Sequence, residues 1–151
     1  MKILAYTSKE YTQKVTVTLS QLRQMERAQR NAYDAGIVKP DTNNLSKLLG
    51  SVAGVLGLLF VTSTPAGVAA GVVGLVTSLS YSQKEVLKDT VYSGYWNLGY
   101  MEDFMVDHPK YSMIEMELPF LEYNVNGKRI RFISGKGIIV RVKTSGGWIY
   151  N

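Results

Sequence analysis

The side chains that could perform chemistry are few, and they gather on one segment. Glu102, Asp103 and Asp107 lie close together, and His108, the only histidine, follows them. Such carboxylates could act as a general acid and base or bind a metal ion. On a helix, however, residues spaced in this way more often form a charged face in water, and His108 is expected to pack or to cap the helix end. The chain has no cysteine and no cofactor motif, so we predict a protein that is not an enzyme and has no metal or cofactor.

The composition and the charge distribution divide the chain into four segments of one α+β unit. Its 151 residues suffice for a single core, and 46% hydrophobic against 19% charged residues excludes a disordered protein. We expect strands and a helix over residues 1–44, an apolar hairpin over 45–83, an aromatic helix over 84–111, and an antiparallel sheet over 112–151. Residues 84–123 carry three lysines and eight acidic residues, whereas residues 124–151 carry six basic residues and no acidic one. These two segments are therefore expected to pair.

The most unusual segment is a run of 36 residues, 48–83, without a charge. Apolar residues occupy every helical face of this run, which is typical of a segment buried on all sides or spanning a membrane. The sequence GSVAGVLGL, which begins at Gly50, recurs as GVAAGVVGL, which begins at Gly67. An alternation of polar and apolar residues, as in a membrane β-hairpin, is absent from residues 52–61, so helices are favoured.

The glycines of this repeat are spaced by four and then by three residues. They are Gly50, Gly54 and Gly57 in the first copy and Gly67, Gly71 and Gly74 in the second. This spacing places each set on one side of a helix, and such smooth sides allow two helices to approach closely. Between the copies, Thr64 can cap a helix that begins at Pro65. The sequence therefore predicts a helical hairpin whose two glycine strips pack against each other.

Three surroundings could bury this hairpin: a membrane, identical subunits, or the rest of this chain. Each arm would be about 24 to 27 Å long, close to the thickness of a bilayer core, and Lys47, Lys84 and Lys88 would hold both ends on the cytoplasmic side. We therefore predict a membrane-inserting or membrane-docking protein, with the lipid bilayer as its partner and its soluble parts on the cytoplasmic side. The alternative is a soluble self-assembling structural protein, such as a virion component, with the hairpin buried between identical subunits. Both hypotheses predict a homo-oligomer.

The glycine-repeat hairpin resembles, in a generic way, the membrane segments of small pore-forming toxins, phage lysis proteins and virion penetration proteins. This resemblance covers residues 48–81 only, and it implies a pore-forming, lytic or penetrating activity. The first residues lack an apolar stretch long enough for a signal peptide, so none is expected.

The N-terminal segment predicts a short hairpin followed by a helix. Residues 2–6 and 14–19 have the composition and alternation of strands. Thr18 and Gln21 have the spacing of a capping box, and apolar residues then recur at helical spacing as far as Gly36. Residues 38–44 are expected to be a connector.

Aromatic residues recur every four positions after the apolar run. They are Tyr92, Trp96, Tyr100 and Phe104. A helix over residues 85–106 would align them on one side, where they could form either a seam in the core or a belt at a membrane interface.

The C-terminal segment predicts a meander of strands with turns at residues 124–127 and 134–137. In this arrangement Glu115 and Glu117 would lie beside Arg129 and Arg131. Three basic residues would then remain free to contact anionic lipid headgroups. They are Lys136, Arg141 and Lys143. No recognised DNA-binding or RNA-binding motif is present, so nucleic acid is not an expected partner.

Overall fold

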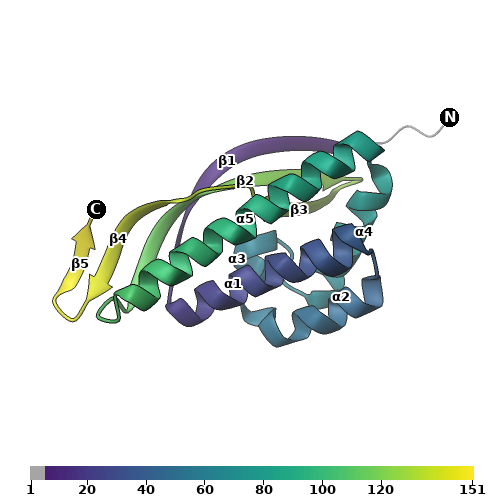
Figure 1. Cartoon of the computed structure of the whole chain (residues 1–151). Coiled ribbons are helices and arrows are strands. Elements are labelled where there is room, and N and C mark those ends of the chain that lie inside the picture. Colours follow the sequence, from purple (N-terminus) through teal and green to yellow (C-terminus); the bar gives the residue numbers. More distant parts are fainter. Residues whose placement is uncertain (1–5) are drawn as a thin grey trace.

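One long strand organises the sheet (Figure 1). In the computed structural model, which describes residues 6–151, β2 (Met113–Val125) pairs with β1 (Tyr6–Val17) along one edge. Its other edge is shared by β4 (Ile138–Thr144) and β3 (Lys128–Ile133), and β5 (Gly147–Tyr150) extends the sheet beyond β4. Each of these pairings is antiparallel. The α+β class and the C-terminal antiparallel sheet are thus confirmed.

The polar and apolar alternation of β2 explains why it occupies the centre. Ile114, Met116, Leu118 and Phe120 are buried, whereas the residues between them are half-buried. This period of two is the signature of a strand with one face in the core. The turn into β3 places Asn126 and Gly127 at φ of 52° and 85°, which Asn-Gly pairs adopt readily.

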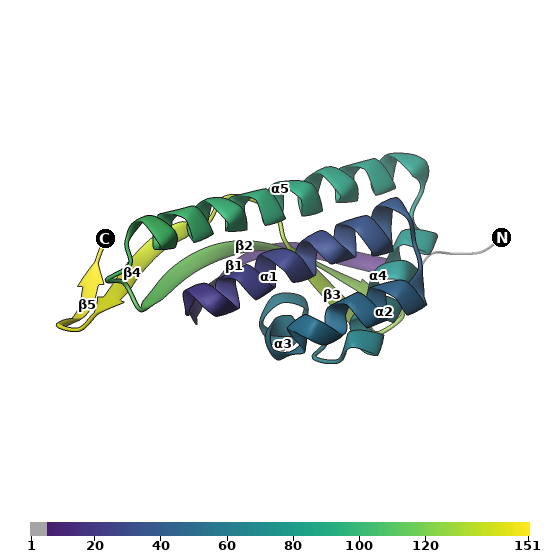
Figure 2. The ribbon, with the colours of Figure 1, turned by 60° about the horizontal axis from the view of Figure 1, so that its bottom comes forward.

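Two antiparallel helices lie side by side against the sheet (Figures 1 and 2). α1 (Leu19–Ala32) begins with the predicted capping box, in which Thr18 and Gln21 bond reciprocally, and ends in a π-helical turn (Tyr33–Val38). α5 (Tyr81–Asp107) includes the predicted aromatic helix and begins a turn earlier, at a second capping box. Both helices therefore start where the sequence satisfies their first amide groups.

A buried glutamine joins these helices to the sheet. Gln29 on α1 is fully buried, and its amide nitrogen donates to the carbonyl oxygens of Val91 on α5 (3.1 Å) and Ile133 on β3 (2.8 Å). Its amide oxygen accepts from the Ile133 amide at 2.9 Å. Gly94 allows α5 to approach β3 closely enough for these bonds, because a Cβ at position 94 would lie 1.8 Å from the Ile133 carbonyl oxygen.

The apolar run forms a second group of helices beside α1 (Figure 2). Its first arm consists of α2 (Thr42–Leu49), a 3-10 segment (Gly50–Val55) and α3 (Leu56–Phe60), and its second arm is α4 (Pro65–Ser78). The predicted start of the second arm is confirmed, with the Thr64 hydroxyl accepting from the Gly67 amide at 3.1 Å.

The first arm differs from the predicted continuous helix. Val52 has φ of −124° and ψ of 23°, which interrupts the helix. The 3-10 turn that follows brings both Val52 and Val55 into the core. We attribute the break to this burial, since glycine-rich helices resist bending weakly.

The predicted N-terminal hairpin is not observed. β1 is one continuous strand from Tyr6 to Val17 that pairs with β2 over its whole length, so residues 7–13 are strand and not a turn. Most of the first predicted strand, residues 2–5, lies outside the described residues. A strand partner distant in the sequence thus overrides the polar composition of residues 7–13.

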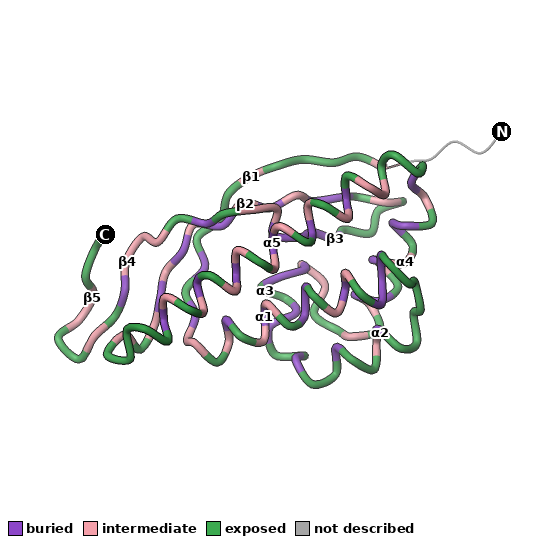
Figure 3. The backbone as a smooth tube through the Cα atoms, viewed as in Figure 1, coloured by how far each residue is buried: buried purple, intermediate pink, exposed green. Residues whose placement is uncertain are grey.

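The core lies between the sheet and the helices (Figure 3). Most of β1 is exposed in that view, whereas the inner sides of the helices and much of β2 and β3 are buried. The large residues of the apolar run belong to this same core. They are Val52, Val55, Leu56, Leu59, Phe60, Val68, Val72, Leu75, Val76 and Leu79.

Candidate functional site

The two glycine strips do not pack against each other, so that prediction is wrong for the single chain. A Cβ built on Gly50, Gly54 or Gly74 would have no described atom within 4 Å. In the second copy, a Cβ built on Gly71 would instead lie 3.7 Å from Ile130 on β3, and one built on Gly67 would meet Thr62 and the capping residue Thr64. The physical reason is that burying the large Val, Leu and Phe side chains releases far more free energy than glycine contacts do. The helices therefore turn most of their large residues inward and leave Gly50, Gly54, Gly57 and Gly74 exposed.

The exposed residues of the apolar run carry no charge, although Leu48 at its start borders a hollow lined by Asp34, Lys39 and Asp41. We use the name uncharged surface for the exposed residues between positions 48 and 78. They are Leu48, Gly50, Ser51, Ala53, Gly54, Gly57, Leu58, Ser63, Thr64, Ala66, Ala70, Gly74 and Thr77. In the described part of the chain, one helical stretch, Thr42–Phe60, is long and apolar enough to cross a membrane, and 39% of its apolar window is buried.

A buried arginine holds the end of this helical group against the sheet. Arg131 on β3 is 5% exposed and donates to the carbonyl oxygens of Leu58 (2.6 Å) and Leu59 (3.3 Å). These carbonyls lie in the last turn of α3, where intrahelical donors are missing and the helix dipole favours a cation. Val61, just beyond this turn, has φ of 80°, a strained value for a β-branched residue.

Arg131 also belongs to a polar network that sequence reasoning missed. It donates to the Tyr11 hydroxyl (2.9 Å) and lies 3.9 Å from the centroid of the Phe120 ring. Tyr11 in turn donates to Glu122 at 2.7 Å, and Arg129 binds the same carboxylate through two nitrogens at 2.9 and 3.0 Å. The Arg129 guanidinium, with the Tyr11 hydroxyl, lowers the pKa of Glu122 to about 2. Only the strand register, which the sequence does not specify, brings these residues together.

The predicted pairing of acidic and basic segments occurs, but with other partners. Glu115 pairs with Arg141 (3.2 Å) and not with Arg129 or Arg131, and Glu122 takes Arg129. The reason is that β3 pairs with residues 120–125, so the β2 segment that carries Glu115 and Glu117 lies beside β4 instead.

The prediction that Arg141 remains unneutralised is therefore wrong. Its guanidinium also lies 4.0 Å from the centroid of the Trp148 ring. Lys143 lies 6.0 Å from the same ring, and both Lys136 and Lys143 are exposed.

The predicted aromatic row on α5 is exposed and is not a seam in the core. Tyr92, Trp96 and Tyr100 are 45%, 48% and 62% exposed, and Phe104 is half-buried. The rings contact one another along the helix, with centroids 6.0 Å apart for Tyr92 and Trp96 and 6.5 Å apart for Trp96 and Tyr100. The core side of α5 is formed instead by Leu87, Val91, Leu98, Met101 and Met105.

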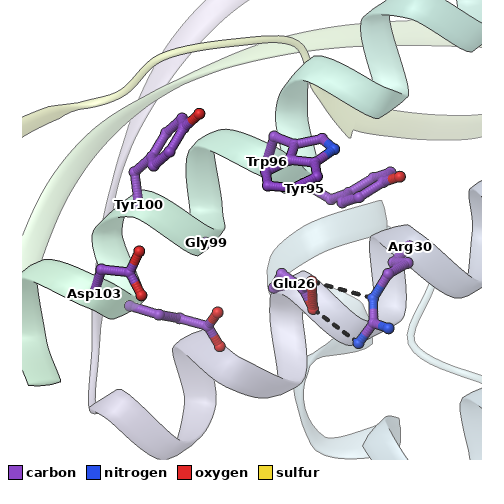
Figure 4. Close-up of a pocket in the computed structure, with 8 residues that line it drawn as sticks. Glu26, Arg30, Tyr95, Trp96, Gly99, Tyr100 and Asp103 are labelled. Atoms are coloured by element: carbon purple, nitrogen blue, oxygen red, sulfur yellow. Dashed lines mark hydrogen bonds and ion pairs between the residues drawn. The ribbon is translucent and has the colours of Figure 1, made fainter.

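The rings of Trp96 and Tyr100 border an open cleft of about 420 Å³ between α1 and α5. Figure 4 shows Tyr95 and Trp96 on one side of Gly99 and Asp103 on the other, with Glu26 facing them from α1. The cleft combines aromatic and acidic walls, and we treat it with the uncharged surface as the candidate functional regions.

Three acidic residues line the cleft against one arginine, Arg30, so its walls carry a net negative charge. Glu26 is paired with Arg30 at 3.1 Å, whereas Glu102 has no ion pair among the described residues. Burial raises the pKa of Glu102, and the neighbouring Glu26 carboxylate raises it further. Asp103 lines the cleft beside Glu102.

His108 closes the C-terminal end of α5 and takes no part in the cleft. Its Nδ1 lies 2.7 Å from the Phe104 carbonyl oxygen, and its ring stacks on Tyr111 with an interplanar angle of 2°. The predicted capping and packing role of His108 is thus confirmed. Within residues 6–151, no group of three or more His, Cys, Asp or Glu residues could hold a metal ion.

In comparisons with known proteins, no family model, no curated protein and no solved structure matches the chain.

Proposed function

We propose that the chain is a non-catalytic structural protein that assembles with identical copies through its uncharged surface. The observation that carries the proposal is the outward position of Gly50, Gly54 and Gly74, whose missing side chains nothing in the described chain replaces. Such a role suits a component of a viral or phage particle.

Exposed helical glycines are unfavourable for a monomer. Each costs about 1 kcal/mol relative to alanine, and here the cost brings no contact inside the chain. A second helix that packs closely on the bare backbone would gain dispersion contacts that a side chain would prevent. In an assembly, these dispersion contacts would offset the free energy that the glycines cost the single chain.

The chemistry of the surface favours a second copy as the occupant. The uncharged surface offers no ionic partner, so a charged partner would lose solvation of its charges without compensation. A copy of the same surface brings small residues and the exposed side chains of Leu48 and Leu58 instead. Interfaces between identical subunits are commonly self-complementary in this way.

Docking on a lipid surface is the second candidate function, favoured by the apolar length of Thr42–Phe60. Insertion of the whole hairpin fits the fold less well. It would withdraw Leu56, Phe60 and Val72 from the core and expose the apolar side of β3, including Ile130 and Phe132, to water. A lipid partner would therefore contact the uncharged surface from outside.

The test compares the oligomeric state of the parent protein with that of variants carrying a charge on this surface. We expect the parent to be an oligomer in detergent-free buffer by light scattering, and Ala53→Lys and Ala70→Lys to be monomers, because a lysine in the interface would be buried without a partner. Ile149→Lys is the matched control, since this exposed residue lies on β5, at the opposite end of the molecule (Figure 1).

Two results would count against assembly. A parent protein that stays monomeric at high concentration, or lysine variants that assemble like the parent, would reject it. Flotation of the monomeric parent with liposomes, abolished by Ala53→Lys, would establish docking on lipid in its place.

A further inference from the structure

We infer that the cleft between α1 and α5 binds an organic cation, either a guanidinium or an ammonium group. The cleft lies outside the uncharged surface, so this inference does not depend on assembly. Three features lead to it: a hollow of about 420 Å³, aromatic side chains that border it, and two carboxylates, Glu102 and Asp103, without an ion pair among residues 6–151.

The aromatic wall supplies two neighbouring π faces. Tyr95 and Trp96 have ring centroids 6.3 Å apart with an interplanar angle of 25°, and Tyr100 continues the wall. Trp96 and Tyr100 are among the most exposed large hydrophobic residues of the described chain. The faces of Trp and Tyr carry partial negative charge and attract guanidinium and ammonium groups more strongly when water is excluded.

Gly99 leaves the centre of the cleft open. It lies between the aromatic side and the acidic side in Figure 4, and a Cβ at this position would have no described atom within 4 Å. A ligand can therefore reach the helix backbone between Trp96 and Asp103. Any larger residue at position 99 would fill this space.

The charges of the cleft sum to a negative value. Arg30 is engaged by Glu26 through two contacts, at 3.1 and 3.3 Å. Glu102 and Asp103 remain, and neither has an ion pair among the described residues. Burial raises the pKa of Glu102, followed by the Glu26 carboxylate, and these effects exceed the lowering by Arg23 and Arg30 of α1.

A bound cation would satisfy both walls at once. Its charge would lie between the ring faces and the Glu102 carboxylate, and its apolar stem would cover Trp96 and Tyr100. A neutral ligand of the same shape would gain the stacking but not the ionic attraction. This difference separates a cation site from a site for a neutral ligand such as a sugar.

The test uses Trp96 fluorescence in a Trp148→Phe background, because these are the only two tryptophans. The probes are Nα-acetyl-arginine methylamide, its neutral isostere Nα-acetyl-citrulline methylamide, and spermidine. We expect saturable binding of the arginine derivative and of spermidine, weakened by added salt, and none of the citrulline derivative in the same range. Tighter binding of spermidine would assign the site to free polyamines, and tighter binding of the arginine derivative would assign it to a polypeptide side chain.

Charge-neutralising variants locate the binding. Glu102→Gln and Asp103→Asn should each weaken binding about fivefold, since one such ion pair contributes about 1 kcal/mol. Asp107→Asn is the matched control: it removes the same charge from α5 outside the cleft and should change the affinity less than about twofold.

Three outcomes would overturn the inference. They are unchanged Trp96 fluorescence with both cations, equal binding of the arginine and citrulline derivatives, and equal weakening by Asp107→Asn and Glu102→Gln. Circular dichroism of each variant establishes that a loss of binding is not a loss of fold.

Discussion

Gly94→Ala should strongly destabilise the fold, although the same substitution in a helix usually stabilises it. An alanine is normally favoured over glycine in a helix by about 1 kcal/mol. At position 94 the added Cβ would lie 1.8 Å from the Ile133 carbonyl oxygen and 2.2 Å from the Gln29 side-chain nitrogen. The first of these atoms belongs to the backbone of β3, so it cannot move without displacing the strand.

The magnitude follows from the contacts that must separate. Because the added Cβ would also meet the Gln29 side-chain nitrogen, Gln29 must move and lose its three hydrogen bonds to Val91 and Ile133, each of which contributes about 1 kcal/mol net. Overpacking adds about 1 to 3 kcal/mol. After subtraction of the helical gain of alanine, a loss of about 3 to 5 kcal/mol remains, which is a large part of the 5 to 15 kcal/mol typical of a domain.

Urea denaturation followed by circular dichroism measures this loss, and Gly99→Ala on the same helix is the control. Gly99 has open space at its Cβ position, so alanine there should raise the free energy of unfolding by about 0.5 to 1 kcal/mol. If Gly94→Ala unfolds at the same urea concentration as the parent, or a higher one, the close approach of α5 to β3 does not exist in solution.

Three further measurements test the polar network and the strained turn. Because the folded-state pKa of Glu122 is about 2, below its ordinary value of 4.5, its stabilisation is complete above about pH 4.5 and is lost as the pH falls toward 2. The free energy of unfolding should fall over this range by on the order of 2 kcal/mol given the exposed Arg129, with a corresponding drop in the urea midpoint, and Glu122→Gln should remove that part of the pH dependence. Arg131→Lys should lower the free energy of unfolding by about 1 to 3 kcal/mol, because one ammonium group cannot reach all the acceptors that the guanidinium binds, and an unchanged urea midpoint would contradict this. Val61→Gly should raise the thermal midpoint, since glycine adopts the φ of 80° without a steric penalty of about 1 kcal/mol or more; a lower midpoint would show that the valine side chain outweighs the strain.

Sequence patterns correctly predicted the elements that are stabilised by residues close together in the sequence. The capping box at Thr18, the helix start at Pro65 and the turn at Asn126 each depend on residues within a few positions of one another, and all are found as predicted. The α+β class follows from the same short-range periodicities. Agreement is therefore good wherever the hydrogen-bonding partner is a neighbour in sequence.

Partners that are distant in sequence explain most of the errors. β1 pairs with β2, about a hundred residues away, and this pairing makes a strand of residues 7–13, whose composition is that of a loop. The Glu122 network requires β1, β2 and β3 in one register, and nothing in the alternation of these strands fixes which residues face each other. The cleft was missed for a related reason, since it forms only when Glu26 of α1 lies opposite the aromatic row of α5.

For the glycine strips, the spacing was correct but the predicted packing partner was wrong. A strip of small residues indicates that another element can approach closely, but it does not identify that element. The large residues between the glycines determine the orientation of the helices, because each buried Val, Leu or Phe contributes about 1.5 to 3 kcal/mol to stability. In this fold they pack against β3 and α1, and Gly50, Gly54 and Gly74 are turned outward as a consequence. No described atom of the chain occupies the space beside Gly50, Gly54 and Gly74, so the partner that we propose for these glycines would have to be a separate molecule.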